Sequence, residues 1–268
     1  MDDHQFRRLL EYLGLSWAGY RKVRKGVKKR IRRHMREMNL TDTEDYLHEL
    51  ERNREKRNEC EMLMTVPISR FFRDKKLWEF LERQILPDLI KDDKDRIPVL
   101  CAGCASGEEV YSLKILWDFL FPYSNEQSTE LIVTAIDMNP IHIKRARAGI
   151  YPASSLKEIP EQFRSIYFQS QAVGRNRYMI KDSLKKGVSW QEHNLLLDLP
   201  PYQFQIIFLR NSILTYYKTD IQKFVLKNII KRLCPKGFLI IGAHEKLPFM
   251  IPDLKHCPAL PYIFKRQY

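Results

Sequence analysis

Short apolar runs alternate with amphipathic segments along the chain after residue 96. The run IPVLCAG (97–103) precedes a helical pattern over 108–121, and ELIVTAID (130–137) precedes another over 139–151 with its C-cap signal at Gly149. Apolar runs without polar alternation are typical of strands buried on both faces of a parallel sheet. The pattern therefore predicts an α/β fold, doubly wound around a largely parallel sheet, with ligands bound off the carboxyl ends of the strands.

Two further apolar runs continue this alternation towards the end of the sequence. YQFQIIFLRN (202–211) and GFLIIGAH (237–244) are predicted strands, and the amphipathic pattern over 219–233 is a predicted helix that Pro235 and Gly237 end. Together the four runs predict a Rossmann-like, nucleotide-type sheet.

A different pattern precedes the third strand. The stretch RNRYMIKDSLKKGVSWQEHNL (175–195) alternates in hydrophobicity around Lys185, Lys186 and Gly187. Alternation on both sides of a glycine-containing turn is typical of an antiparallel hairpin. We therefore expect a small antiparallel β insertion at about residues 175–193.

The first third of the chain has few strand signals. We expect residues 1–90 to form a small N-terminal helical domain and residues 91–268 to form the α/β domain, with the charged stretch KDDKDR (91–96) as a linker.

The stretch CAGCASGEEVYS (101–112), at the end of the first predicted strand, is a candidate ligand site. Its C-x-x-C spacing is compatible with a redox pair or half a zinc site, but Cys101 belongs to the strand and no second ligand pair follows, so no metal is predicted. The stretch lacks the closing Gly-Lys-Ser/Thr of a P-loop and the G-x-G-x-x-G of a dinucleotide site. What remains is a loop of small residues against which a ligand can pack.

Two acids accompany this loop. Glu109 follows it, and Asp137 ends the next strand, where an acid suits the ribose hydroxyls of an adenosine. Each acid also has a structural interpretation: Ser106 and Glu109 fit a capping box, and Asp137 fits a turn before Asn139. These interpretations do not exclude a ligand role.

Composition indicates the class of protein, its compartment and the charge of its partner. The chain has 268 residues, 44% of them hydrophobic, and no stretch approaches the ~20 apolar residues of a membrane span. Its five cysteines lack a disulfide framework, so we expect a soluble, cytoplasmic protein with reduced thiols. The net charge of +13 predicts an acidic partner, either a protein surface or nucleic acid.

Six motifs follow one another in an order typical of one enzyme family. They are TVPISRFFRD (65–74), AGCASGEEVYS (102–112), TAIDMNPIHIKRARAGIY (134–151), HNLL (193–196), FLRNSILTYY (208–217) and GAHEKLP (242–248). Over nearly its whole length the chain thus resembles the chemotaxis-receptor glutamate O-methyltransferases, the CheR type of S-adenosylmethionine-dependent enzymes. The resemblance implies a small all-α domain followed by a Rossmann-like class I methyltransferase domain with a small antiparallel β insertion.

The resemblance also implies roles for individual residues. Arg73 and Tyr216 match the catalytic arginine and tyrosine of the family, and Pro67 stands where the family usually has an asparagine. One residue more separates Asn211 from Tyr216 than in the commonest family motif, so Thr215 and Tyr217 are neighbouring candidates. The implied cofactor-binding residues are Pro67, Ser69, Arg73, Glu109, Asp137, Asn194, Leu195, Arg210 and Asn211.

The implied reaction asks for little acid–base chemistry. The methyl group of a sulfonium is already electrophilic, and a glutamate carboxylate, with a pKa of about 4.3, is ionised at neutral pH, so no general base is needed. The work is alignment of the carboxylate oxygen, the methyl carbon and the sulfur. Arg73 can hold a carboxylate as a fork, and Tyr216 can line the path of the methyl group.

Residues 20–38 predict a basic helix. Ten lysines and arginines precede its first acid, Glu37, while apolar residues recur at every fourth position from Val23 to Met35. In the resembled family a basic helix of this domain faces the acidic methyl-accepting helices of the receptor, and RNA or DNA is the competing partner. The predicted partner-binding residues are Arg21, Arg24, Lys25, Lys28, Lys29 and Arg32.

Other functions stay open at this point. The same cofactor can serve a different protein or small-molecule acceptor, and a catalytically degenerate relative can bind the cofactor or dock a partner without turnover. A nucleic-acid methyltransferase draws support from the positive charge and from LPPY (199–202), which is similar to the D/N-P-P-Y of amino-methylating enzymes.

Overall fold

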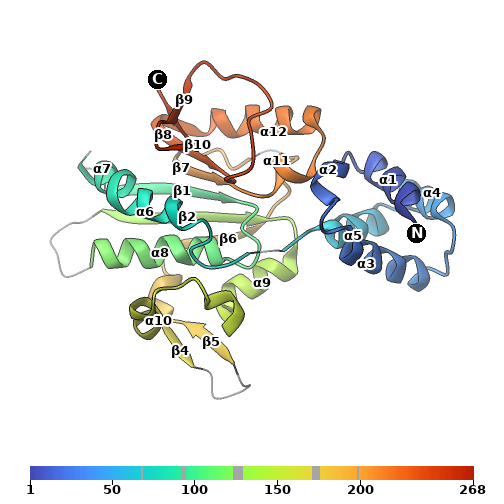
Figure 1. Ribbon diagram of the computed structural model, residues 1–268, viewed down its shortest axis with the longest axis horizontal. Coiled ribbons are helices and arrows are strands. Elements are labelled where there is room, and N and C mark those ends of the chain that lie inside the picture. Colours follow the sequence, from blue (N-terminus) through green and yellow to red (C-terminus); the bar gives the residue numbers. More distant parts are fainter. Residues whose placement is uncertain (68, 92–94, 123–128, 171–175, 198) are drawn as a thin grey trace.

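A computed structural model describes residues 1–67, 69–91, 95–122, 129–170, 176–197 and 199–268. The predicted linker at 91–96 and the start of the predicted β insertion at 175 lie partly outside these residues. The described chain forms an N-terminal helical region beside a larger α/β region, and the two meet at one end of the sheet (Figure 1).

Five helices form the helical region. Asp2 begins the first with a capping box in which Gln5 reciprocates, and Asn53 caps the fifth. Their apolar faces bury one common core that includes Phe6, Ile31 and Tyr46, each fully buried. The helices are α1 (Asp3–Tyr12), α2 (Trp17–Tyr20), α3 (Arg24–Glu37), α4 (Thr43–Arg52) and α5 (Arg54–Met64).

The basic helix is shorter than predicted. It begins at Arg24, as α3, because residues 21–23 form a turn after α2. The predicted apolar stripe is confirmed: Val27, Ile31 and Met35 are buried in the core of the helical region.

A seven-stranded sheet organises the α/β region. The strands lie in the order β6-β2-β1-β7-β8-β10-β9, and only the contacts of β10 with β8 and β9 are antiparallel. The chain therefore reverses its direction across the sheet between β1 and β7, which is where doubly wound sheets bind ligands. The strands are β1 (Arg96–Ala102), β2 (Glu130–Asp137), β6 (Val188–Glu192), β7 (Phe204–Leu209), β8 (Leu233–Ile241), β9 (Leu254–Cys257) and β10 (Leu260–Arg266).

Helices cover both faces of this sheet, as the fold prediction requires. Alternate residues of β1 belong to two hydrophobic cores, one on each face of the sheet. Val99 lies in the core that α8 covers, and Leu100 lies in the core that α12 covers. Figure 1 shows α12 above the sheet and α8 below it. The helices of this region are α6 (Lys75–Phe80), α7 (Leu86–Lys91), α8 (Glu108–Leu120), α9 (Pro140–Ala148), α10 (Glu161–Tyr167), α11 (Ile213–Tyr216) and α12 (Thr219–Lys231), with a π-helical turn at Leu81–Ile85 between α6 and α7.

Helices α6 and α7 precede residue 91, but they pack on the core of the sheet through residues such as Leu77 and Leu86. A division into independent domains at residues 90 and 91 stays a prediction. Among the described residues, no helix is both long enough and apolar enough to cross a bilayer.

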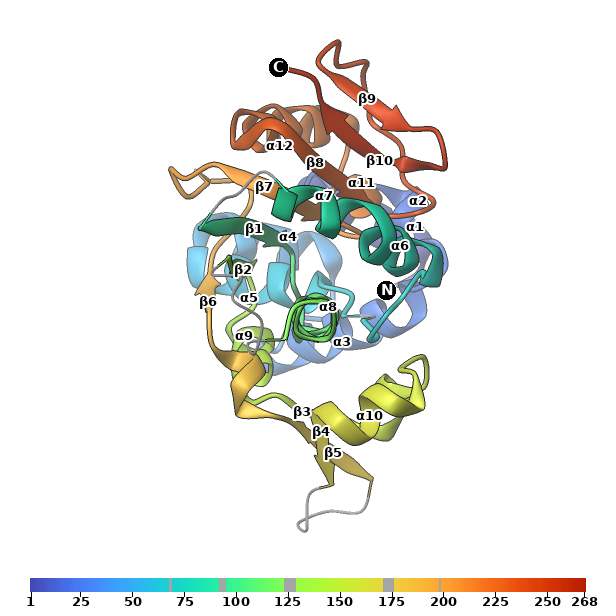
Figure 2. The same cartoon turned by 90° about the vertical axis from the view of Figure 1, so that its left-hand side faces the viewer.

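The predicted hairpin at 175–193 is wrong, although a small antiparallel sheet exists. Its strands are β3 (Ile150–Pro152), β4 (Phe168–Ser170) and β5 (Arg177–Ile180), in the order β3-β5-β4. A 3₁₀ turn at Asp182–Lys185 then leads the chain away, and β6 pairs in parallel with β2. Figure 2 shows this small sheet with α10 at the opposite pole of the molecule from β9.

The end of the third predicted helix also needs correction. Helix α12 ends at Lys231 and strand β8 begins at Leu233, so Pro235 and Gly237 lie within the strand and are not what ends the helix. Lys236 between them adopts a positive φ of 60°, and the pairing of β7 with β8 shifts register there. An irregular strand start tolerates a proline, because a bulge removes the need for its missing N–H.

Candidate active site

A cavity of about 490 Å³ lies at the carboxyl ends of β1, β2, β6 and β7, and the helical region closes its other side. Residues from α1, α2 and α5 line it together with the loops of the sheet. All ten predicted site residues line this one cavity: Pro67, Ser69, Arg73, Glu109, Asp137, Asn194, Leu195, Arg210, Asn211 and Tyr216.

The loop between β1 and α8 forms the floor of the cavity. The N–H groups of Gly103 and Cys104 both donate to the carbonyl of Ile136, at 2.8 and 2.9 Å. Gly103 has a φ of 82°, and a Cβ there would lie 3.0 Å from Cβ of Ser212. The loop is therefore tied to the end of β2 and leaves no room for a larger side chain at this point.

The predicted capping box of Ser106 and Glu109 is wrong. Helix α8 begins after Gly107, whose φ of 86° is left-handed, and no side chain caps it. Gly107 is required there because a Cβ would lie 2.7 Å from the Trp190 ring. Glu109 is thereby available for another contact.

The two cysteines of the loop are packing residues. Cys101 and Cys104 are buried, and burial raises the pKa of both thiols well above the usual value. Since the thiolate is the reactive species, this setting disfavours redox chemistry. No three His, Cys, Asp or Glu side chains of the described residues are grouped to hold a metal ion.

Asp137 has a structural role and also faces the cavity. Its carboxylate accepts from the N–H groups of Ala105 and Asn139, each at 2.9 Å, and contacts Nδ1 of His142 at 3.2 Å. The predicted turn before Asn139 is thus present. The same contacts fix the carboxylate in the cavity wall, where it can accept from hydroxyl groups of a ligand.

Arg210 and Glu109 form a buried ion pair, with Asp74 as a second carboxylate on the guanidinium. Burial lowers the pKa of Arg210, but the nearby charges of Glu109 and Asp74 outweigh it, so the net shift is upward. The arginine is therefore charged and joins α8, the residue before α6, and the end of β7. The contact is made by Oε2 of Glu109, which accepts from Nη1 of Arg210.

Two aromatic residues anchor the segment that carries Arg73. Phe71 is fully buried and packs edge-on against Tyr151, with ring centroids 4.8 Å apart. The N–H of Phe72 donates to Oγ of Ser112 at 2.9 Å, and Nε1 of Trp78 donates to the carbonyl of Arg73 at 2.8 Å. The backbone of Arg73 is thus fixed on the α/β core, and Arg73 itself lines the cavity.

Tyr216 ends the short helix α11, and its ring lies against that of Tyr20 with centroids 5.1 Å apart. Burial raises the pKa of Tyr216, the charge of Arg73 opposes this, and Glu245 adds to it. Tyr217 also lines the cavity, and burial raises its pKa to about 12. Thr215 is not part of the cavity wall, so only the two tyrosines remain candidates for the family position.

Glu245 supports the cavity wall from outside the cavity, and no role was predicted for it, although its motif was recognised. Its carboxylate accepts from the N–H of Asn211 at 3.0 Å, the N–H of Gly242 at 2.7 Å and Oγ1 of Thr215. A Cβ at Gly242 would lie 2.5 Å from Nδ2 of Asn211. Glu245 therefore holds the loop from Asn211 to α11 in place.

Three further observations concern the ligand that the cavity fits. Asn194 uses Oδ1 to accept from the N–H of Leu196, which fixes the loop after β6, and Leu195 is buried. Nε2 of His193 and Oγ of Ser212 are buried and lack a hydrogen-bond partner among the described residues, and both residues line the cavity. Unpaired buried polar atoms are costly unless a ligand or water satisfies them. A wall with acids, small residues and unpaired polar atoms fits an adenosine-containing ligand such as S-adenosylmethionine.

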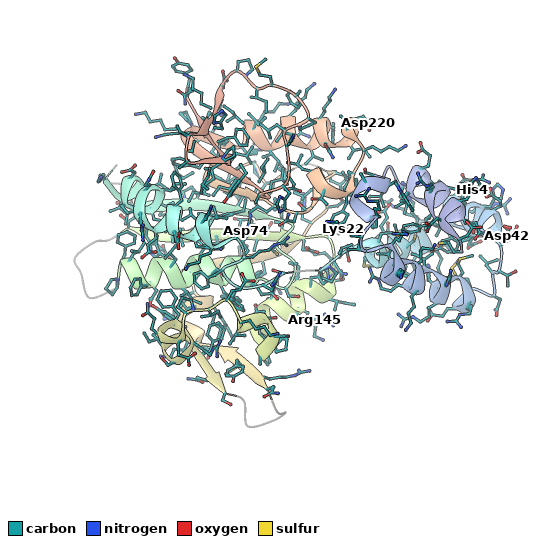
Figure 3. All side chains as sticks on the ribbon, in the orientation of Figure 1. His4, Lys22, Asp42, Asp74, Arg145 and Asp220 are labelled. Atoms are coloured by element: carbon teal, nitrogen blue, oxygen red, sulfur yellow. The ribbon has the colours of Figure 1, made fainter. Side chains whose placement is uncertain are left out.

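The predicted partner-binding residues lie outside this cavity, at or near α3. Arg24 and Lys28 pair with Asp3 of α1, at 3.2 and 2.8 Å. Arg32 donates to the carbonyl of Met1. Arg21, Lys25 and Lys29 are exposed. Figure 3 shows Lys22, in the turn before α3, at the boundary between the helical region and the α/β region.

The LPPY stretch does not support amino methylation. Tyr202 is 63% exposed, it precedes β7, and it does not line the cavity. An aromatic residue that holds a flipped base must face the active site, so this motif is a surface turn.

Comparison with known proteins agrees with the geometry. A chemotaxis protein methyltransferase of Listeria monocytogenes is 28% identical over 235 residues, which are 88% of this chain and 86% of that protein. Chemotaxis protein methyltransferase 1 of Pseudomonas aeruginosa is 30% identical over 189 residues, or 69% and 68% of the two chains. A solved N-methyltransferase, NodS of Bradyrhizobium japonicum in complex with S-adenosylhomocysteine, is far more distant: 18% identity, 61% of each chain and a TM-score of 0.32.

The family described as CheR methyltransferase, SAM binding domain, matches residues 68–262, most of the chain and nearly all of the cavity loops. The chain therefore belongs to the CheR methyltransferase family and is an S-adenosylmethionine-dependent methyltransferase.

Proposed function

We propose that this enzyme transfers the methyl group of S-adenosylmethionine to glutamate carboxylates of an acidic protein, namely a chemotaxis receptor. One observation carries the proposal: Arg73 and Tyr216 line the same cavity as Asp137 and the loop after β1. The names of the relatives and the basic face of α3 support a receptor as the acceptor.

S-adenosylmethionine supplies an electrophilic methyl group when it is bound. In the proposal Asp137 accepts from the ribose hydroxyls, and Asn194 and Leu195 border the adenine. Glu109, Arg210 and Asn211 shape the wall between the loops, and Ser69 and Pro67 border the segment from α5. Pro67 has no side-chain amide to offer, so it can contact the ligand only through its ring and its carbonyl.

Arg73 and Tyr216 orient the acceptor carboxylate. The raised pKa of Tyr216 keeps its hydroxyl protonated at neutral pH, so it can donate a hydrogen bond but cannot act as a base. A glutamate acceptor needs no base, because it is already ionised. A fixed arginine charge and a hydroxyl donor therefore suit a carboxylate acceptor better than an amine, which must lose a proton.

The test uses methyl-labelled S-adenosylmethionine and the cytoplasmic fragment of a chemoreceptor from the same organism. We expect label on the receptor fragment that mild base releases as methanol, and none when the acceptor glutamates are replaced by alanine. Arg73→Ala should lower kcat/KM by tenfold or more, since orientation terms of this kind are large. Base-stable label, or label on nucleic acid from the same cells, would overturn the proposal.

Calorimetry with S-adenosylhomocysteine measures cofactor binding separately from methyl transfer. Binding without transfer to the receptor fragment would contradict the proposed acceptor and leave the cofactor site intact. The proposed acceptor places the enzyme in the cytoplasm, where the signalling part of a receptor lies.

A further inference from the structure

The segment Gly14–Tyr20, called here the docking segment, lies directly against the backbone that carries Tyr216. The N–H of Ser16 donates to the carbonyl of Tyr216 at 2.8 Å, and the N–H of Lys218 donates to the carbonyl of Gly14 at 2.9 Å. Leu15 and Tyr217 form an antiparallel bridge between these two bonds. A short antiparallel ladder between two segments of the chain thus joins the helical region to the end of α11.

Gly19 allows this approach. A Cβ at Gly19 would lie 2.1 Å from the carbonyl oxygen of Thr215 and 3.1 Å from Cα of Tyr216. Real side chains do not tolerate such distances to backbone atoms, so any residue larger than glycine must push α2 and α11 apart. Tyr20 then places its ring on that of Tyr216, and its hydroxyl donates to the carbonyl of Met64 at 3.0 Å.

Helix α11 cannot hold its own position. It has four residues, Ile213–Tyr216, and a helix of about one turn has no stability of its own. Glu245 fixes the loop before the helix, through the N–H of Asn211, and the third residue of the helix, through Oγ1 of Thr215. The last residue, Tyr216, has the docking segment as its neighbour from the other region. Figure 1 shows α2 and α11 at the junction of the two regions.

We propose that the docking segment positions Tyr216 for methyl transfer, so that the helical region completes the catalytic end of the cavity in addition to any role in partner capture. The adenosine end is formed by Gly103, Asp137 and the loop after β6, which belong to the α/β region. Disturbing the docking segment should therefore separate catalysis from cofactor binding. The inference rests on the proposed function for the role of Tyr216.

Gly19→Ala tests this, with Gly26→Ala as the matched control. Gly26 lies on α3, and a Cβ there would meet nothing within 4 Å. We expect Gly19→Ala to lower kcat on the receptor fragment by tenfold to a hundredfold, because a misplacement of about 1 Å can cost that much. The KM for the fragment and the Kd for S-adenosylhomocysteine should stay within about twofold of the Gly26→Ala values.

Hydrogen–deuterium exchange gives a second readout that needs no acceptor. Peptides that cover residues 209–218 should exchange faster in Gly19→Ala than in Gly26→Ala, while peptides from β1 and β2 should be unchanged. If the wild-type enzyme does not methylate the receptor fragment, the proposed function fails, yet the exchange result still decides whether the docking segment holds α11.

Ser16→Pro is the second variant in case Gly19→Ala does not fold. Proline removes the N–H that donates to Tyr216 and directs its Cδ at the same carbonyl, so it opens the ladder at Ser16 without adding a side chain at Gly19. The same fall in kcat at constant Kd supports the proposal. Equal kcat in both variants and Gly26→Ala would overturn it, and so would an equal loss of kcat and of cofactor affinity in a folded variant.

Discussion

Arg210 and Glu108 are both buried, but the charge of Arg210 is compensated by its neighbours and that of Glu108 is not. Arg210 is buried with Glu109 and Asp74 on its guanidinium, so its charge is compensated. Glu108 is only 5% exposed and its Oε2 has no partner among the described residues; burial raises its pKa, and the hydrogen bonds of its own backbone N–H and of Ser69, together with nearby His142, offset only part of this effect. A buried carboxylate with so little compensation favours its neutral form.

The pH dependence of stability follows from this difference. Burial raises the pKa of Glu108, so the folded state holds a proton that the unfolded state releases at lower pH. Its contribution is complete below about pH 4 and is lost as the pH rises through the folded pKa. Glu108→Gln should therefore be more stable than wild type at about pH 8 and equal to it at about pH 4, as measured by thermal unfolding.

Glu109→Gln is the natural control, because the residue is adjacent and the substitution identical. It removes a charge from Arg210 and should destabilise the protein at about pH 8 by roughly 1–3 kcal/mol. If both variants shift the melting temperature in the same direction at that pH, the contrast between the two carboxylates is wrong.

At the scale of elements, Arg30 of α3 contacts the end of α5. Nε of Arg30 donates to the carbonyl of Leu63 at 2.9 Å, and Nη2 donates to the carbonyl of Thr65 at 2.8 Å. Both carbonyls lie where α5 ends and the segment with Arg73 begins. The basic helix therefore supports the active-site segment as well as presenting charge.

Arg30→Ala should destabilise the protein by roughly 2–3 kcal/mol, because two partly buried carbonyl groups lose a charged donor. Arg33→Ala, on the same helix and with an exposed side chain paired only to Glu37, should have little effect. Urea unfolding of both variants measures the difference. Equal stability of the two would show that the Arg30 contacts do not hold α3 to α5.

Element boundaries could be predicted from sequence where the signal is local. The strands at 97–103 and 130–137 correspond to β1 and β2, and Gly149 indeed caps α9 with a φ of 67°. The hairpin failed because alternation in β5 and β6 does not reveal the strand with which each one pairs. Pro235 was misinterpreted as the residue that ends a helix, because a strand accepts proline only where its pairing is irregular, as it is between β7 and β8.

The candidate site was predicted almost entirely through the family resemblance, which located all ten residues in one cavity. Glu245 and the docking segment were missed for a physical reason. Both contact the segment around α11, which is far away in the chain, and such contacts leave no composition or spacing that a sequence can show.

At the scale of the whole molecule, the basic side chains behind the net charge of +13 are not all equally available to a partner. Asp3 neutralises part of the α3 face by pairing with Arg24 and Lys28. The exposed charges left for a partner include those of Lys25 and Lys29, with Arg21 nearby. Acceptor capture should therefore depend on where charge is removed, and not only on how much.

Lys25→Glu combined with Lys29→Glu tests this against Lys227→Glu combined with Lys231→Glu. All four lysines are exposed, and each pair of substitutions lowers the net charge equally, but the second pair lies on α12. At about 50 mM salt, the α3 variant should raise the KM for the receptor fragment by roughly tenfold or more, since exposed charges act over about 10 Å at 0.1 M salt.

Near 1 M salt the α3 variant should approach wild type, because screening then confines such interactions to about 3 Å. The affinity for S-adenosylhomocysteine should not change in either variant, since none of the four lysines lines the cavity. A long-range attraction governed by total charge would weaken capture equally in both variants. A larger loss in the α3 variant, reversed by salt, is the result that assigns the acidic acceptor to this helix.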